Sequence, residues 1–91
     1  MPARKVAFDD ASSITMLDRE TLLYEEPNYS VAVWFDFMPG FFSRGRILHK
    51  SSIQQWKNFP PGSEPNIPVA KQDEIIEKVR QYWHKEPVQI G

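Results

Sequence analysis

A proline-rich segment divides this chain and restricts its fold more than any other feature. Residues 59–68 contain Pro60, Pro61, Gly62, Pro65 and Pro68. Proline fixes φ and lacks a backbone N–H, so this segment can lie neither inside a helix nor in a central strand. We therefore expect a structured linker here, with different elements before and after it.

The part before the linker carries the pattern of a β-strand. Apolar or aromatic residues occupy every second position between residues 28 and 37, namely Tyr29, Val31, Val33, Phe35 and Phe37. A period of two puts these side chains on one face, which we expect to be the core face. Trp34 falls on the opposite face, which indicates that this second face is not entirely solvated.

Further strands are indicated by runs at residues 5–8, 14–17, 21–25 and about 44–50. Turn sequences separate the runs, and Pro39-Gly40 is typical of a type II turn because glycine supplies the positive φ at its second central position. Each connection is too short for a parallel crossover. The pattern therefore predicts an antiparallel β-meander of four to five strands over about residues 4–57.

The part after the linker has the spacing of an amphipathic helix over about residues 70–85. Its apolar positions are Ile75, Ile76, Val79, Tyr82 and Trp83. Val88 and Ile90 are expected to form a last edge strand or an extended tail, and Trp56 and Phe59 to wedge between sheet and helix. The expected fold class is α+β: one domain, residues 1–91, with a C-terminal helix packed on one face of the meander.

Composition narrows the setting of the protein. The chain has no cysteine, which excludes a disulfide framework and a thiolate metal site. Arg4 and Lys5 precede only three apolar positions, which cannot supply a signal peptide, and no apolar run approaches the roughly 20 residues that span a bilayer. We expect a cytoplasmic protein that does not insert into membranes.

Charge is distributed unevenly along the chain. Residues 9–36 hold seven acids and a single base, and the bases Arg44, Arg46, Lys50 and Lys57 then follow with no acid before Glu64. Either the bases form a patch for an anionic partner, or neighbouring acidic and basic strands pair across the sheet.

No pattern typical of a catalytic centre or a metal site is present. The serines lack a nucleophile elbow, and His49 and His84 lack the spacing of a zinc site. Adjacent residues in a strand point to opposite faces, so neither Asp9-Asp10 nor Glu25-Glu26 converges on one site unless a turn bends the pair. We expect solvated charges at edges and turns. We therefore expect no catalytic residue, no metal and no cofactor. An enzyme stays an alternative only if His49 lies in a cleft beside a carboxylate.

The segment from Met38 to Arg46 is the candidate binding site. Its turn could expose two phenylalanines surrounded by two arginines. Aromatic residues and arginine together are favoured at interface hot spots. Alternatively, one phenylalanine folds back over the core edge. The candidate partner-binding residues are Phe41, Phe42, Arg44, Arg46, Lys50 and Trp34.

The second half of the chain resembles a known family. The pattern Ser52-Ile53-Gln54-Gln55-Trp56, the pair Pro60-Pro61, Ile67, and Ile75-Ile76 with Val79 are similar to a family of bacterial polymorphic-toxin immunity proteins, the immunity protein 74 family. The resemblance covers about residues 46–90. It implies a β-meander with a C-terminal helix, and an activity of binding and neutralising a cognate toxin.

These observations favour a non-catalytic protein-binding domain, and the resemblance favours one of the immunity type. The alternative is a small nucleic-acid-binding module that places Arg44, Arg46, Lys50 and Lys57 on phosphates and stacks nearby aromatics on bases. A pI near 6.1 argues against general nucleic-acid affinity but not against a local patch. Exposed strand edges also permit a homodimer, with Trp34 as a candidate contact.

Overall fold

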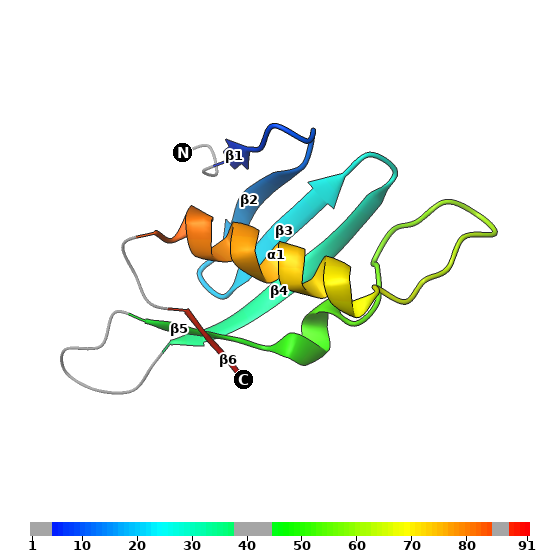
Figure 1. The fold of residues 1–91 in the computed structure, drawn as a ribbon. Coiled ribbons are helices and arrows are strands. Elements are labelled where there is room, and N and C mark those ends of the chain that lie inside the picture. The colour runs from blue at the N-terminus through cyan, green and yellow to red at the C-terminus, as the bar shows by residue number, and fades with distance from the viewer. Residues whose placement is uncertain (1–4, 38–44, 85–87) are drawn as a thin grey trace.

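The computed structural model describes residues 5–37, 45–84 and 88–91. Six strands form one sheet, and a single helix crosses one of its faces (Figure 1). The strands are β1 (Lys5–Ala7), β2 (Ser13–Asp18), β3 (Thr21–Glu26), β4 (Tyr29–Phe37), β5 (Arg46–Leu48) and β6 (Val88–Ile90). They lie side by side in sequence order, so the α+β fold class and the meander are confirmed.

Two tight hairpins build the centre of the sheet. Between β2 and β3, the Asp18 carboxylate accepts a hydrogen bond from the Glu20 N–H at 2.8 Å. Between β3 and β4, Asn28 adopts a φ of 69°, a left-handed conformation that asparagine tolerates better than most residues. The resulting register pairs Leu22 with Val33 and Tyr24 with Val31. The hydrophobic residues of both strands therefore lie on the same face of the sheet.

The core lies between this sheet and helix α1 (Val69–Tyr82). Val31, Val33 and Phe35 are buried, as the alternation in β4 predicts. The other buried hydrophobic residues are Ile14, Leu22, Tyr24, Leu48, Ile53, Trp56, Ile67, Ile75, Ile76, Val79, Tyr82 and Trp83. The helix thus buries the stripe that its spacing indicates, although it ends at Tyr82 rather than near residue 85. None of the described helices is long and apolar enough to cross a membrane.

The strand that follows β4 is shorter than the sequence predicts. β5 ends at Leu48, and the 3-10 helix η1 (Lys50–Ile53) comes next. At this point in the sheet, a side-chain acceptor takes the place of a backbone carbonyl. The Trp34 N–H donates to the Ser52 hydroxyl at 3.1 Å instead of to a neighbouring strand. A tight turn can therefore begin without leaving this donor unpaired.

The last strand is the one element that departs from the meander. β6 runs parallel to β5, which it can do because α1 carries the chain back along the sheet before β6 begins. Val88 and Ile90 therefore form the edge strand that was one of two expectations for the tail.

In the segment after η1, Trp56 is buried and Phe59 is exposed. Trp56 is 7% exposed, and its ring lies 4.9 Å from that of Tyr29 and 6.4 Å from that of Tyr24. Phe59 is 40% exposed, so the prediction that it also wedges into the core is wrong. The Lys57 and Asn58 N–H groups donate to the Ser30 carbonyl, which holds the chain beside β4 and directs Phe59 away from the core.

Two lysines of α1 connect the helix to the acidic first half of the chain. Lys78, 8% exposed, donates to the Asp10 carboxylate and to the Ser12 hydroxyl, and Lys71 donates to Glu26 at 3.2 Å. The Asp10 side chain is 53% exposed, which agrees with the expected solvated charge, whereas the Glu26 side chain is 17% exposed, so the expectation is wrong for Glu26; neither ion pair was predicted. Sequence reasoning missed this because the partners lie 45 and 68 residues apart.

Candidate binding surface

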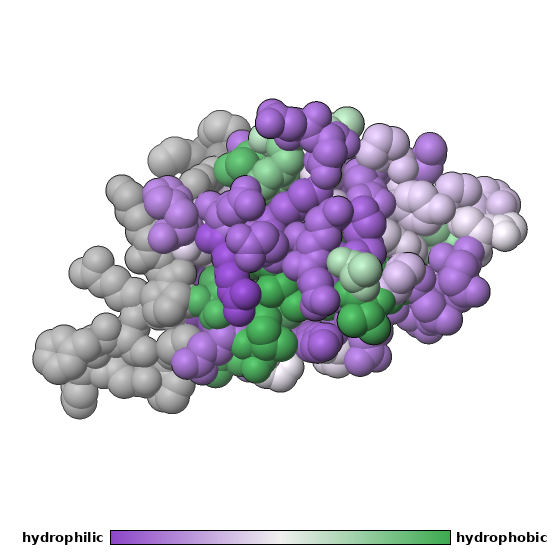
Figure 2. Space-filling view, viewed as in Figure 1, coloured by the Kyte–Doolittle hydropathy of each residue, from purple (hydrophilic) through white to green (hydrophobic). Residues whose placement is uncertain are grey.

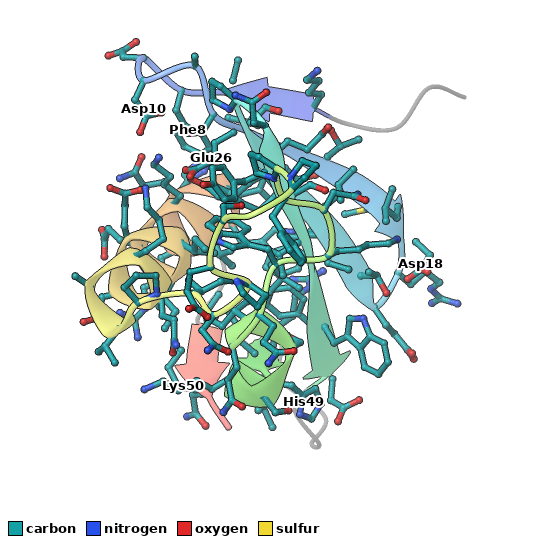
Figure 3. The ribbon with its side chains drawn as sticks, turned by 90° about the vertical axis from the view of Figure 1, so that its right-hand side faces the viewer. Phe8, Asp10, Asp18, Glu26, His49 and Lys50 are labelled. Carbon is teal, nitrogen blue, oxygen red and sulfur yellow. The ribbon has the colours of Figure 1, made fainter. Side chains whose placement is uncertain are left out.

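The face of the sheet opposite α1 is the candidate site, and we call it the open face. Figure 3 shows α1 on one side of the sheet and Asp18 projecting from the other. Helix α1 does not pack over this side, and among the described helices only η1 borders it, through Ser51 and Ser52. Its side chains follow from the alternation and the register, and its apolar members are Leu17, Leu23, Ala32, Trp34 and Ile47.

Trp34 dominates the open face. Its side chain is 60% exposed at a position where both neighbours in the strand, Val33 and Phe35, are buried. Leu17, on β2, is 50% exposed. Exposed single hydrophobic residues are ordinary, but two large ones around one hollow on a sheet face are typical of a contact surface.

A groove of about 510 Å³ lies beside the Trp34 indole. Ala32 and Trp34 form part of its lining, Leu17 and Thr21 come from the β2–β3 hairpin, and Lys57 is its charged member. The remaining lining residues are Val31, Ser51, Ser52 and Gln55. The groove is thus mainly apolar, with polar groups contributed by η1 and the segment that follows it.

A second hollow, of about 240 Å³, contains the pair formed by His49 and Asp36. The His49 Nε2 lies 2.7 Å from the Asp36 Oδ2. Glu20, Thr21, Trp34 and Phe35 complete the lining. Thr21 and Trp34 line both hollows, so the two hollows are adjacent.

The geometric condition for an enzyme is therefore met in one respect, because His49 does lie beside a carboxylate. A carboxylate orients an imidazole for proton transfer, but hydrolysis by a triad also needs a nucleophile in contact with the other ring nitrogen. The nearby Ser52 hydroxyl donates to the His49 backbone carbonyl at 2.6 Å and accepts from the Trp34 N–H. This hydroxyl is thus engaged with the backbone rather than with the imidazole.

Metal-binding chemistry finds no support in the described part of the chain. Across residues 5–37, 45–84 and 88–91, no group of three or more histidine or acidic side chains could hold a metal ion. The most perturbed titratable groups lie instead under α1. The Lys78 ammonium, together with the Ser12 hydroxyl and N–H, holds the pKa of the Asp10 carboxyl well below its usual range.

Only some of the predicted site residues lie where the structure describes them. Phe41, Phe42 and Arg44 lie outside the described residues. Lys50 is exposed at the start of η1, and its N–H donates to the Gly91 carbonyl at 3.2 Å. Trp34 is exposed on the open face.

Arg46 occupies the helix side of the sheet. Its guanidinium lies 4.2 Å from the centre of the Trp83 ring, and burial lowers its pKa. Arg46 pairs with Phe37, and the next strand residue, Ile47, pairs with Asp36 on the open face. Arg46 and Trp34 therefore point to opposite sides of the sheet, so Arg46 does not share a surface with Lys57, which lines the groove beside Trp34.

Sequence reasoning missed most of the open face. Asp36 lies two residues from Trp34 in β4, so the alternation already placed both on one side. Lys57, Leu17 and Glu20 come from other elements, and the sequence alone carries no signal that brings them to the same hollows.

Comparison of the chain with protein-family models, with curated proteins and with solved structures finds no match. The resemblance to the immunity protein family therefore stays a prediction.

Proposed function

We propose that this chain is a non-catalytic protein-binding domain whose contact surface is the open face around Trp34. The observation that carries the proposal is the 60% exposure of Trp34, which lines two adjacent hollows. Tryptophan is enriched at interface hot spots because it combines a large apolar area with an N–H donor. A partner that covers the indole and fills the groove would remove that area from water.

An immunity-type role, in which the partner is a toxin that the chain neutralises, is the form of this function that the resemblance suggests. Such a role requires occupancy of a partner surface and no chemistry. A rigid sheet whose face is left uncovered by its helix fits this requirement, because sheet residues hold their side chains in fixed positions.

The test is capture from an extract of the native host on immobilised protein. We expect Trp34→Ala to lose a protein that the wild type retains. Phe59→Ala is the matched control, since Phe59 is an exposed aromatic residue that does not line either hollow. If Trp34→Ala retains the same proteins as the wild type, the open face is not the contact surface.

The nucleic-acid alternative is less well supported by the geometry. Lys57 lines the groove beside Trp34, but Arg46 packs against Trp83 on the other side of the sheet. Binding to single strands should quench an exposed indole and weaken with added salt. We expect mixed oligonucleotides at low salt to leave the tryptophan emission unchanged, and salt-sensitive quenching would favour the alternative.

A further inference from the structure

The open face carries opposite charges in its two hollows. Lys57 lines the groove. Glu20 and Asp36 line the second hollow. Because Trp34 lines both hollows, charges of opposite sign border different hollows around this apolar residue.

These charges are available to a partner. Neither Lys57 nor the Glu20 carboxylate forms an ion pair with any of the described residues. Asp36 contacts His49, yet its side chain remains 63% exposed. Of the other acids of the first half, Asp10 and Glu26 pair with the lysines of α1 on the far side of the sheet.

A surface with this arrangement is complementary to itself. Two copies that meet face to face are related by a two-fold axis lying in the plane of the interface. If that axis passes near Trp34, perpendicular to the line from Lys57 to Asp36, it brings the lysine of each copy over the carboxylates of the other. Both contacts form at once, since the symmetry repeats each of them.

We propose that the open face binds the open face of a second copy of this chain, forming a two-fold symmetric dimer. Lys57 of each copy contacts Asp36 and Glu20 of the other, and the Trp34 side chains pack at the centre against the groove. The proposal rests on the proposed function, because it assigns an occupant to the same surface. Any other protein that binds the open face must then displace the second copy.

The helix side offers a poorer surface for self-association. In Figure 2, most of that side is hydrophilic, and hydrophobic residues gather mainly in a strip below α1. A stable interface needs an apolar centre with a polar rim. The open face has an apolar centre at Trp34 and charged residues around it. A two-fold axis through that centre brings charges of opposite sign together.

Sedimentation equilibrium of the full chain over a concentration series tests the proposal. We expect the wild type to shift from the mass of one chain toward that of two. Lys57→Glu and Asp36→Lys each place like charges at both symmetric contacts, so each variant should raise the dimer dissociation constant at least ~10-fold. Trp34→Ala should do the same by removing the apolar centre.

The decisive measurement mixes the two charge variants. In a dimer of Lys57→Glu with Asp36→Lys, one contact joins Glu at position 57 to Lys at position 36, and the other joins the unchanged Asp36 to the unchanged Lys57. Two variants that are monomeric alone should therefore form a mixed dimer. Lys50→Glu is the matched control, because Lys50 is an exposed lysine that lines neither hollow of the open face.

Three outcomes would overturn the dimer. The wild type could stay monomeric over the whole series, or Trp34→Ala could dimerise as well as the wild type. The two charge variants could also stay monomeric when they are mixed. Circular dichroism of each variant establishes that it is folded. A monomeric wild type that still captures another protein through Trp34 would reject the dimer and leave the protein-binding function standing. A dimer whose Trp34→Ala variant loses no other captured protein would support self-association alone.

Discussion

Replacing Trp56 with alanine should be among the most destabilising substitutions in this domain, and replacing Trp34 among the mildest for a tryptophan. Trp56 is 7% exposed and its ring contacts those of Tyr24 and Tyr29. A tryptophan can bury up to about 250 Å², which at roughly 25 cal/mol per Å² corresponds to an upper limit of about 6 kcal/mol. Partial collapse of the cavity, and the surface that the denatured chain already buries, bring the expected cost to about 3–5 kcal/mol.

Trp34 provides the internal comparison. Its 60% exposure leaves at most about 100 Å² to lose, and its removal opens no enclosed cavity. We expect Trp34→Ala to cost about 1–2 kcal/mol. A domain of this length has a free energy of unfolding of roughly 5–13 kcal/mol, so only Trp56→Ala removes a large part of it.

Urea denaturation followed by far-ultraviolet circular dichroism measures both variants without depending on the fluorescence of the missing indole. With a slope of about 1 kcal/mol per molar urea, Trp56→Ala should lower the midpoint by roughly 3–5 M or leave the chain unfolded in buffer. A shift for Trp56→Ala no larger than that for Trp34→Ala would refute the assignment of Trp56 to the core.

Three further predictions concern charge and backbone. Because the Lys78 ammonium lowers the pKa of Asp10, that carboxylate contributes stability above about pH 4 which is lost as pH falls. Asp10→Asn should weaken the acid dependence of the urea midpoint, and an unchanged acid dependence would contradict this origin. Burial, reinforced by Glu26, raises the pKa of the Tyr24 phenol, so the stability that Tyr24 contributes is complete below about pH 10 and declines above it. Tyr24→Phe should lessen the drop in urea midpoint between pH 9 and pH 11, and an unchanged drop would contradict this origin. Gly62 has a φ of 82° with open space where a Cβ would lie, so Gly62→Ala should cost about 1 kcal/mol through backbone strain alone and lower Tm by about 5 °C.

The sequence was most informative where its signals were local. The alternation of Val31, Val33 and Phe35 fixed the core face of β4, and the spacing of Ile75, Ile76 and Val79 fixed the buried stripe of α1. Both patterns follow from the geometry of a single element, which a stretch of sequence contains in full. The fold class was therefore predictable.

The candidate site was less predictable because it depends on contacts between elements. Trp34 was identified as facing away from the core, but Lys57, Leu17 and Glu20 join it only through the packing of the β2–β3 hairpin and η1. Arg46 shows the opposite case. Its place in a basic stretch suggested that Arg46 belongs to an exposed patch. Leu48, two residues further along β5, is buried on the helix side, so the alternation of the strand puts Arg46 on that side too, over the Trp83 ring.

The order of the strands also bears on how the chain folds. From β1 to β5 every pairing joins neighbours in the sequence, so these strands can form as successive hairpins, each on a timescale of microseconds. β6 is different, because it can join β5 only after α1 has docked and returned the chain along the sheet. The rate-limiting step of folding should therefore be the closure of this crossover, and substitutions in the buried stripe of α1 should slow folding more than substitutions in the β2–β3 turn.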